Sequence, residues 1–242
     1  MREILRIFFK TNSFVSKIIK KLGPTNSFYY TIKKEIVKKI LIKYPPYGGY
    51  LHDNIISSFW DPIRFATISL AINTIKNENI KGNLAELGVY KGESSKLIHL
   101  LAPNRKLYLF DTFEGFPIKY LENNHESHRF KDTNLEIVKR NIGDMENVII
   151  RKGIFPDTAK NLENEKFSFV SIDVDLYLST LEGLEFFYPR ISEGGYILIH
   201  DYNNPYESNN AVFRAVKEFM SNKPEKIIEI PDINGTVLIR KI

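Results

Sequence analysis

The fold is decided by residues 83–94, which read Asn-Leu-Ala-Glu-Leu-Gly-Val-Tyr-Lys-Gly-Glu-Ser. The apolar run at 83–87 predicts a strand, and a helix is predicted after Gly88 and Gly92, with Ser94 or Ser95 as its N-cap. Glycines here let the backbone approach a ligand, and the unpaired N–H groups of a helix N-terminus favour an anionic group such as a carboxylate. The Gly-x-x-x-Gly spacing is a weak signal by itself, because a plain strand-to-helix turn has the same pattern.

Apolar runs and helical stretches alternate along the following sequence. Strands are predicted at 83–87, 107–110, 148–151, 167–172 and 195–199, and helices at 94–101, 133–142, 157–163 and 179–190. A further helix is predicted to begin at Asp61-Pro62, because proline suits the first helical turn. Such alternation gives βαβ units and therefore a parallel sheet.

The C-terminal end of the sequence has a different pattern. The β-rich runs at 226–230 and 236–239 flank Asp232-Ile-Asn-Gly235, and Asn-Gly signals a tight reversal of the chain. The prediction is an α/β fold with five parallel strands and a C-terminal antiparallel hairpin. This is the Rossmann-like plan of class I methyltransferases rather than that of a six-stranded dinucleotide-binding fold.

Two acidic residues at strand ends indicate the kind of ligand. Glu86, at the end of the first strand, suits a ligand with an ammonium or sulfonium group, which S-adenosylmethionine has and NAD lacks. Asp111 ends the second strand, 23 residues after Gly88. Nucleotide-binding α/β folds place an acid at this point to bind the ribose hydroxyls. Both positions therefore predict a nucleoside ligand.

Five spaced motifs carry a family resemblance. They are Glu86-Leu-Gly-Val-Tyr-Lys-Gly92, Asp111-Thr-Phe-Glu-Gly-Phe-Pro117, Gly153-Ile-Phe-Pro-Asp-Thr158, Asp173-Val-Asp-Leu-Tyr177 with Ser179-Thr180, and Tyr188-Pro-Arg-Ile-Ser-Glu-Gly-Gly195. In this order they resemble the macrocin O-methyltransferase (TylF-type) family over about residues 55–220. The resemblance implies S-adenosylmethionine as methyl donor and a hydroxyl acceptor, typically on a sugar. The implied cofactor contacts are Glu86, Gly88, Tyr90, Gly92, Ser94, Asp111, Thr112, Phe113, Gly153 and Asp173.

The same resemblance implies a divalent cation, usually Mg²⁺, held by an acid after the fourth strand and an acid pair after the fifth. Asp173 matches the first acid, and the pair falls on His200 and Asp201, so a histidine replaces one carboxylate. Adjacent parallel strands lie about 4.8 Å apart and should bring these side chains together. Imidazole suits Mn²⁺, Fe²⁺ or Zn²⁺ better than Mg²⁺. The predicted cofactor is a divalent metal, Mg²⁺ or Mn²⁺. The alternatives are a different metal, or none, with His200 as a base.

Methyl transfer to an alcohol needs a group that takes or weakens the hydroxyl proton. Asp173 and His200 are the predicted catalytic residues, because either can accept that proton while a metal would lower the hydroxyl pKa. Asp175 is interpreted either as a metal contact or as a cap of the helix near Ser179.

The polar segment 118–134 is predicted to cover the acceptor. It contains His125 and His128, which are interpreted as solvated loop side chains rather than metal ligands.

Charge is distributed unevenly along the 242 residues. Residues 1–50 hold 11 Lys or Arg and 2 acids, whereas residues 51–242 hold 23 and 27. The mildly acidic body argues against nucleic acid as a partner. Residues 1–22 and 31–43 are predicted helices that cap the core or a partner subunit, and contact with a membrane surface is the alternative. The predicted division is a basic helical extension over 1–50 and a methyltransferase domain over 51–242.

The sequence also bears on the location of the protein and on competing functions. The N-terminus lacks a secretory signal pattern and no run suits a spanning helix, which predicts a cytoplasmic protein, and the absence of cysteine excludes thiol chemistry. A homo-oligomer acting on a sugar-containing small molecule is expected, either a surface-polysaccharide or nucleotide-sugar precursor or a glycosylated metabolite. The alternatives are an NAD-dependent sugar oxidoreductase and a non-catalytic cofactor-binding scaffold at a membrane surface.

Overall fold

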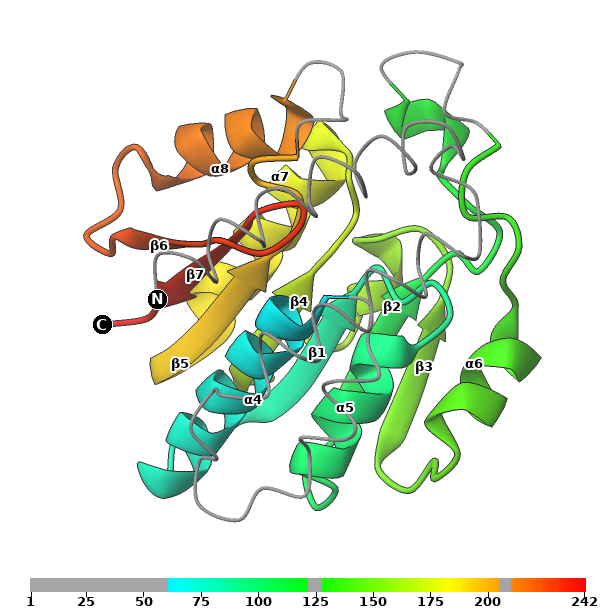
Figure 1. Cartoon of the computed structure of the whole chain (residues 1–242), viewed down its shortest axis with the longest axis horizontal. Coiled ribbons are helices and arrows are strands. Elements are labelled where there is room, and N and C mark those ends of the chain that lie inside the picture. Colours follow the sequence, from blue (N-terminus) through cyan, green and yellow to red (C-terminus); the bar gives the residue numbers. More distant parts are fainter. Residues whose placement is uncertain (1–60, 122–127, 205–209) are drawn as a thin grey trace, which may run out of the picture. The chain divides into compact units, whose positions relative to one another are not determined.

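The computed structural model describes residues 61–121, 128–204 and 210–242 (Figure 1). By its internal contacts the chain divides into two compact units, Met1–Pro62 and Ile63–Ile242. The two helices predicted within residues 1–43, and the domain boundary predicted at residue 50, lie outside the described residues.

The second unit is built around a seven-stranded sheet, whose strands lie in the order β3-β2-β1-β4-β5-β7-β6. β1 to β5 pair in parallel, and β7 runs antiparallel to both β5 and β6. The strands are β1 (Asn83–Leu87), β2 (Leu107–Asp111), β3 (Val148–Lys152), β4 (Phe167–Ile172), β5 (Ile191–Ile199), β6 (Ile227–Ile230) and β7 (Thr236–Arg240). The predicted class I methyltransferase plan, five parallel strands closed by an antiparallel hairpin, is confirmed.

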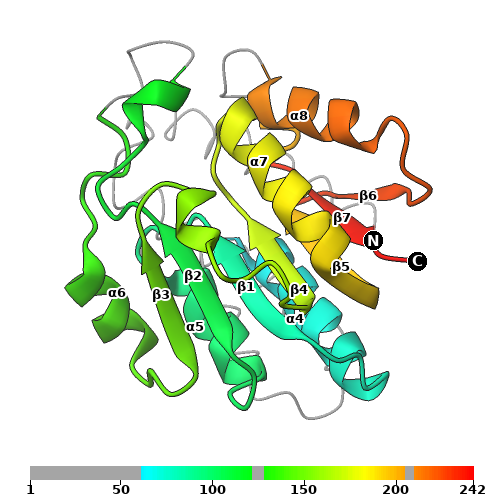
Figure 2. The same ribbon diagram turned by 180° about the vertical axis from the view of Figure 1, so that it is seen from behind.

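Helices cover both faces of this sheet. α4 and α5 lie on one face, and α7 and α8 lie on the other (Figures 1 and 2). The α-helices are α4 (Pro62–Asn77), α5 (Glu93–Leu101), α6 (Leu135–Ile142), α7 (Tyr177–Phe187) and α8 (Ala211–Met220). Short 3₁₀ turns are η1 (Ile118–Tyr120), η3 (Asp157–Ala159) and η4 (Tyr188–Arg190). Because β1 to β5 are parallel, their carboxyl ends lie together at one end of the sheet.

The core on the α7 face is aromatic. Phe187 of α7 contacts Phe110, Phe155 and Phe167, with ring centroids 5.8, 5.5 and 5.2 Å from its own. All six residues of β4 are buried, as expected for a central strand covered on both faces. This packing fixes the end of β4, where Asp173 follows.

Three element predictions need correction. The helix predicted at 157–163 is only the 3₁₀ turn η3, and β5 begins at Ile191 rather than at 195. α8 was not predicted, although Ala211, Val212, Ala215 and Val216 are buried at helical spacing. The period was present in the sequence, but the segment lies between the last parallel strand and the hairpin, where no βαβ crossover requires a helix.

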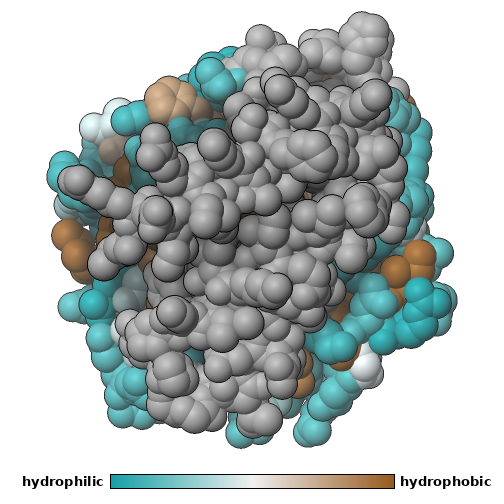
Figure 3. All heavy atoms as spheres, viewed as in Figure 1, coloured by the Kyte–Doolittle hydropathy of each residue, from teal (hydrophilic) through white to brown (hydrophobic). Residues whose placement is uncertain are grey.

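The described residues visible in Figure 3 are largely hydrophilic, and the large exposed apolar side chains include Ile118, Ile228 and Ile242. Within residues 61–121, 128–204 and 210–242, no helix is both long enough and apolar enough to cross a membrane.

Gly88 and Gly143 provide a matched test of the turn after β1. Both have positive φ, +88° and +85°, but a Cβ on Gly88 would lie 1.9 Å from the carbonyl oxygen of Asp173, whereas one on Gly143 would meet nothing within 4 Å. We expect Gly143→Ala to lower the free energy of unfolding by about 1–3 kcal/mol, from backbone strain alone. Gly88→Ala should cost more, because β1 and β4 must also separate. Urea denaturation measures both, and equal losses would contradict the close approach.

Candidate active site

Glu86 lies inside the protein, beneath the first turn of α5. Its side chain is fully buried, and its two carboxylate oxygens accept hydrogen bonds from the hydroxyls of Ser94 and Ser95. The prediction that one of these serines is the N-cap is wrong, since the N-cap is Gly92, in the left-handed conformation, with no side-chain cap. The serines instead join α5 to the end of β1.

The environment of Glu86 also changes its acidity. Burial raises the pKa of Glu86 to about 7, although the hydrogen bonds from Ser94 and Ser95 and the charge of Arg64 lower it. The carboxyl group is therefore partly protonated in neutral solution, and a cation placed near it would favour the ionised form.

Asp111 organises the turns at the ends of β1 and β2. One carboxylate oxygen accepts the backbone N–H groups of Val89 and Tyr90, at 2.7 and 2.9 Å, and the other accepts that of Phe113 at 2.7 Å. The backbone N–H of Gly153 donates to the carbonyl of Asp111 at 2.9 Å. The structure thus brings together the predicted residues of three strand ends, with Asp111 at their centre.

Thr112 closes the turn that follows Asp111. Its hydroxyl donates to the carbonyl of Gly115 at 2.6 Å and accepts the N–H of Glu114 at 3.2 Å. Its separation of 3.5 Å from the second oxygen of Asp111 is at the limit of a hydrogen bond. Phe113 is buried, and its backbone is in the left-handed region with φ +56°.

Tyr90 and the segment 128–133 lie against each other at the same edge. The Tyr90 hydroxyl donates to Asp132 at 2.8 Å, its ring meets Phe130 edge-on at 5.1 Å, and its carbonyl accepts the hydroxyl of Thr133. Arg129 pairs with Asp175 at 3.2 Å. Arg129 and Phe130 were not singled out from the sequence, because loop contacts carry no periodic signal.

The two predicted loop histidines have different outcomes. His128 is exposed, which fits its interpretation as a solvated side chain, and His125 lies outside the described residues.

The capping interpretation of Asp175 is wrong, since α7 begins at Tyr177 after Leu176 as N-cap, with no side-chain cap. Asp175 is instead engaged by Arg129.

Asp173, His200 and Asp201 meet at the ends of β4 and β5. His200 Nδ1 lies 3.1 Å from Asp173 Oδ1 and 2.7 Å from Asp201 Oδ2. The backbone aligns them, since the N–H of Asp173 bonds to the carbonyl of Leu87 and that of His200 to the carbonyl of Ile172. One ligand atom from each of the three side chains lies within 4.8 Å of the others. Neighbouring strand ends therefore produce the predicted cluster.

Arg64 is the residue of this cluster that sequence reasoning missed. From α4 its guanidinium donates to Asp173 Oδ2 at 2.7 Å, and its side chain is 6% exposed. Burial raises the pKa of Asp173, but Arg64 and His200 outweigh it and hold that pKa well below its usual range. Burial and Arg64 lower the pKa of His200, but Asp173 and Asp201 raise it to about 9. The cluster thus contains two carboxylates and two cationic groups.

The chemistry of this donor set is that of a mixed oxygen and nitrogen centre. An acid, an imidazole and a second acid can hold a divalent cation that accepts nitrogen, such as Mn²⁺ or Zn²⁺. Asp201 is further oriented by Asn204, whose amide donates to Oδ1 at 2.7 Å. Without a cation, the same groups form a charge-balanced network around the imidazole.

Comparisons with known proteins agree with this fold. The family profile described as Macrocin-O-methyltransferase (TylF) matches residues 60–237. A relative named 8-demethyl-8-(2,3-dimethoxy-alpha-L-rhamnosyl)-tetracenomycin-C 4'-O-methyltransferase, from Streptomyces olivaceus, is 23% identical over 72% of this chain and 79% of its own. Mycinamicin III 3''-O-methyltransferase, from Micromonospora griseorubida, is 25% identical over 69% of this chain and 72% of its own.

Solved structures share the fold. The O-methyltransferase NovP aligns with a TM-score of 0.65 at 21% identity, over 89% of this chain and 98% of that one. CalS11, a calicheamicin methyltransferase, aligns with a TM-score of 0.60 at 17% identity, over 91% of this chain and 95% of that one.

His200 should make stability depend on pH. Its pKa is raised from 6.5 to about 9, so its contribution is complete below about pH 6.5 and is lost as pH rises to about 9. We expect the free energy of unfolding, measured with urea in chelator, to fall over this window in the wild type and less in His200→Gln. Glu86, whose pKa is raised to about 7, also lowers the free energy of unfolding as pH rises, but over a lower range, between about pH 4.5 and 7. Identical pH profiles for the two proteins would contradict the charged His200.

Proposed function

We propose that this chain, which belongs to the macrocin-O-methyltransferase (TylF) family and is an S-adenosylmethionine-dependent O-methyltransferase, methylates a hydroxyl group of a sugar. The observation that carries the proposal is the position of the Asp173, His200 and Asp201 cluster beside the glycine turn after β1. The name of the Streptomyces olivaceus relative contains a rhamnosyl group, which supports a sugar acceptor.

The acceptor is either a sugar on a glycosylated metabolite or a precursor of a surface polysaccharide, such as a nucleotide sugar. We favour the polysaccharide setting, since no residue singled out in this chain is specific for a macrolide. The oxidoreductase alternative loses support, because the antiparallel strand β7 lies between β5 and β6 and the matching family transfers methyl groups.

The cofactor is proposed to bind at the carboxyl ends of β1 to β3. Bound S-adenosylmethionine supplies a methyl group on a positively charged sulfur. The turn from Gly88 to Gly92 and the N-terminus of α5 would hold its carboxylate, with Ser94 as part of that turn. Asp111 would accept hydrogen bonds from the ribose, and Thr112, Phe113 and Gly153 would line the adjacent wall. Tyr90 would border the reacting group. Glu86 would hold the first turn of α5 in place, because it accepts hydrogen bonds from Ser94 and Ser95.

Asp173 is the proposed proton acceptor. Its carboxylate would take the proton of the acceptor hydroxyl as that oxygen forms its bond to the methyl carbon and the carbon–sulfur bond breaks, which would leave S-adenosylhomocysteine. Asp173 is ionised and its side chain is 23% exposed, whereas His200 remains protonated below about pH 9 while no cation is bound. Arg64 fixes one oxygen of Asp173 and leaves the other toward His200. The remaining rate enhancement would come from positioning.

The divalent metal is a further part of the proposal. Asp173, His200 and Asp201 fit such an ion by donor type and spacing, as described above. A cation held there would act as a Lewis acid that lowers the pKa of the acceptor hydroxyl. In that state His200 would have to offer the lone pair of Nδ1, and Asp173 would be a ligand of the ion while Arg64 keeps its hydrogen bond to Oδ2.

Chelation tests the metal proposal. Excess chelator should abolish methyl transfer to a sugar acceptor while calorimetry shows nearly unchanged cofactor affinity, since the proposed cofactor contacts lie mostly on β1 to β3. Mn²⁺ should restore the rate at least as well as Mg²⁺, and His200→Asp should shift the preference toward Mg²⁺. Full activity in chelator would eliminate the metal and leave the imidazolium centre. No methyl transfer to any sugar, with or without metal, would contradict the proposed function itself.

Asp111 is tested through its ligand. Asp111→Ala should weaken binding of S-adenosylhomocysteine at least tenfold, because a hydrogen bond to a charged group contributes about 1.5–3 kcal/mol. Asp111 also holds the backbone of Val89 and Tyr90, so affinity alone is ambiguous. A 2',3'-dideoxyribose analogue separates the two effects by calorimetry. The substitution should cost the analogue much less than the parent ligand, and equal losses would remove Asp111 from the ribose contact.

A further inference from the structure

His200 uses only one of its two ring nitrogens in the active-site cluster. Nδ1 contacts Asp173 and Asp201, whereas Nε2 is buried and has no hydrogen-bond partner within the described residues. The side chain is only 3% exposed, so bulk water does not satisfy this atom. A buried ring nitrogen normally has a partner, and that partner decides which nitrogen carries the hydrogen.

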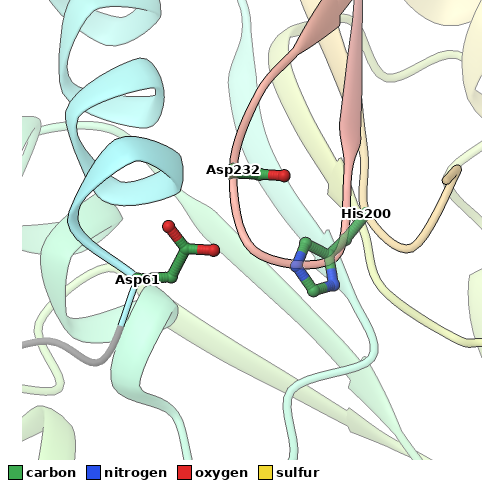
Figure 4. A group of neighbouring side chains, drawn as sticks. All are labelled: Asp61, His200 and Asp232. Carbon is green, nitrogen blue, oxygen red and sulfur yellow. The ribbon is translucent and has the colours of Figure 1, made fainter. Parts of the chain in front are cut away.

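Asp232 lies next to this unused nitrogen. It belongs to the turn between β6 and β7, and one of its carboxylate oxygens lies within 4.8 Å of a ring nitrogen of His200. Figure 4 shows the carboxylate of Asp232 beside the imidazole of His200. Because Nδ1 is already engaged, the nitrogen available to Asp232 is Nε2. The separation is within the reach of one bridging water.

The turn that carries Asp232 is tied to the residues after β5. The backbone N–H of Tyr202 donates to the carbonyl of Gly235 at 2.8 Å. A Cβ on Gly235 would lie 2.6 Å from the side chain and 2.9 Å from the backbone nitrogen of Asn203. Thr236 donates its hydroxyl to Asp232 from within the turn. The terminal hairpin is therefore held against the loop that follows His200 and Asp201, which keeps the carboxylate in place.

We propose that Asp232 is a positioning residue that accepts the Nε2–H of His200, directly or through one water, and so turns Nδ1 toward Asp173 and Asp201. The inference rests on the proposed function, in which His200 belongs to the catalytic centre. A carboxylate behind a histidine fixes its orientation and the position of its hydrogen, as in carboxylate–histidine–metal arrangements. The same contact serves whether Nδ1 faces a cation or the two carboxylates alone.

Histidine nitrogen NMR tests this contact without any methyl transfer. The full chain has five histidines, so ¹⁵N-histidine labelling gives few signals, and His200→Gln identifies the one from His200. In metal-free protein we expect a downfield one-bond Nε2–H signal for His200. Asp232→Ala should abolish it through solvent exchange, and Asp232→Asn, whose amide oxygen is a weaker acceptor, should retain it with an upfield shift. Absence of the signal in the wild type, or an identical signal in both variants, would overturn the proposal.

Two matched variants separate positioning from general damage. Asp144 faces the ring of another buried histidine, His99, at 3.6 Å, so Asp144→Asn should change only the His99 signal. Thr236→Val removes the hydroxyl that contacts Asp232 but keeps the carboxylate, and should leave the Nε2–H signal of His200 in place. Loss of the His200 signal in either variant would overturn the assignment to Asp232.

Metal affinity provides the second measurement. Asp232→Ala should weaken Mn²⁺ binding, followed by electron paramagnetic resonance, about 10–100-fold, whereas Asp144→Asn should not change it. An unchanged affinity in Asp232→Ala would contradict the positioning of Nδ1. If the wild type binds no Mn²⁺, the metal part of the proposed function fails, while the NMR result still decides the contact with Asp232.

Discussion

The close approach of the turn after β1 to the end of β4 is the constraint on which the site depends. A Cβ at Gly88 would overlap the carbonyl oxygen of Asp173, and the N–H of Asp173 bonds to the carbonyl of Leu87. The proposed cofactor turn and the acidic cluster are therefore parts of one contact between two neighbouring strands. In-line methyl transfer needs the two reacting groups at fixed separation, and this contact sets that separation through backbone rather than through mobile side chains.

Several buried charges meet at this contact, and the protein balances them. Arg64 reaches Asp173 from α4, and His200 lies between Asp173 and Asp201. Buried ions are tolerated only when they are paired and hydrogen-bonded, so removing one member leaves another uncompensated. The charge of Glu86, which lies in β1 just before Leu87, is stabilised in a different way. Glu86 has two hydroxyl donors, and its pKa is raised by burial to about 7, so that it can lose its charge.

Much of this architecture could be predicted from residues near one another in the sequence. Strands such as 83–87 and 167–172 have the observed bounds because their apolar runs end at polar or glycine-bearing turns. The meeting of Asp173 with Asp201 follows from strand adjacency, which motif order already implies. Arg64 could not be found this way, since it contacts Asp173 across 109 positions from a helix whose pattern only indicates burial. The prediction of a serine N-cap is wrong because both hydroxyls donate instead to Glu86, which lies eight and nine residues earlier, at the end of β1.

Histidine at position 200 changes what the rest of the centre must provide. A cluster of three acids has excess negative charge and needs a cation to offset it, whereas His200 and Arg64 already balance Asp173 and Asp201. A divalent cation would have to use the lone pair of Nδ1, which the proton of the charged imidazole occupies. Cation and proton therefore exclude each other at that atom. Relative to an all-acid centre, histidine at position 200 should weaken the binding of hard cations such as Mg²⁺ most. These ions gain least from a nitrogen ligand and must still displace the proton.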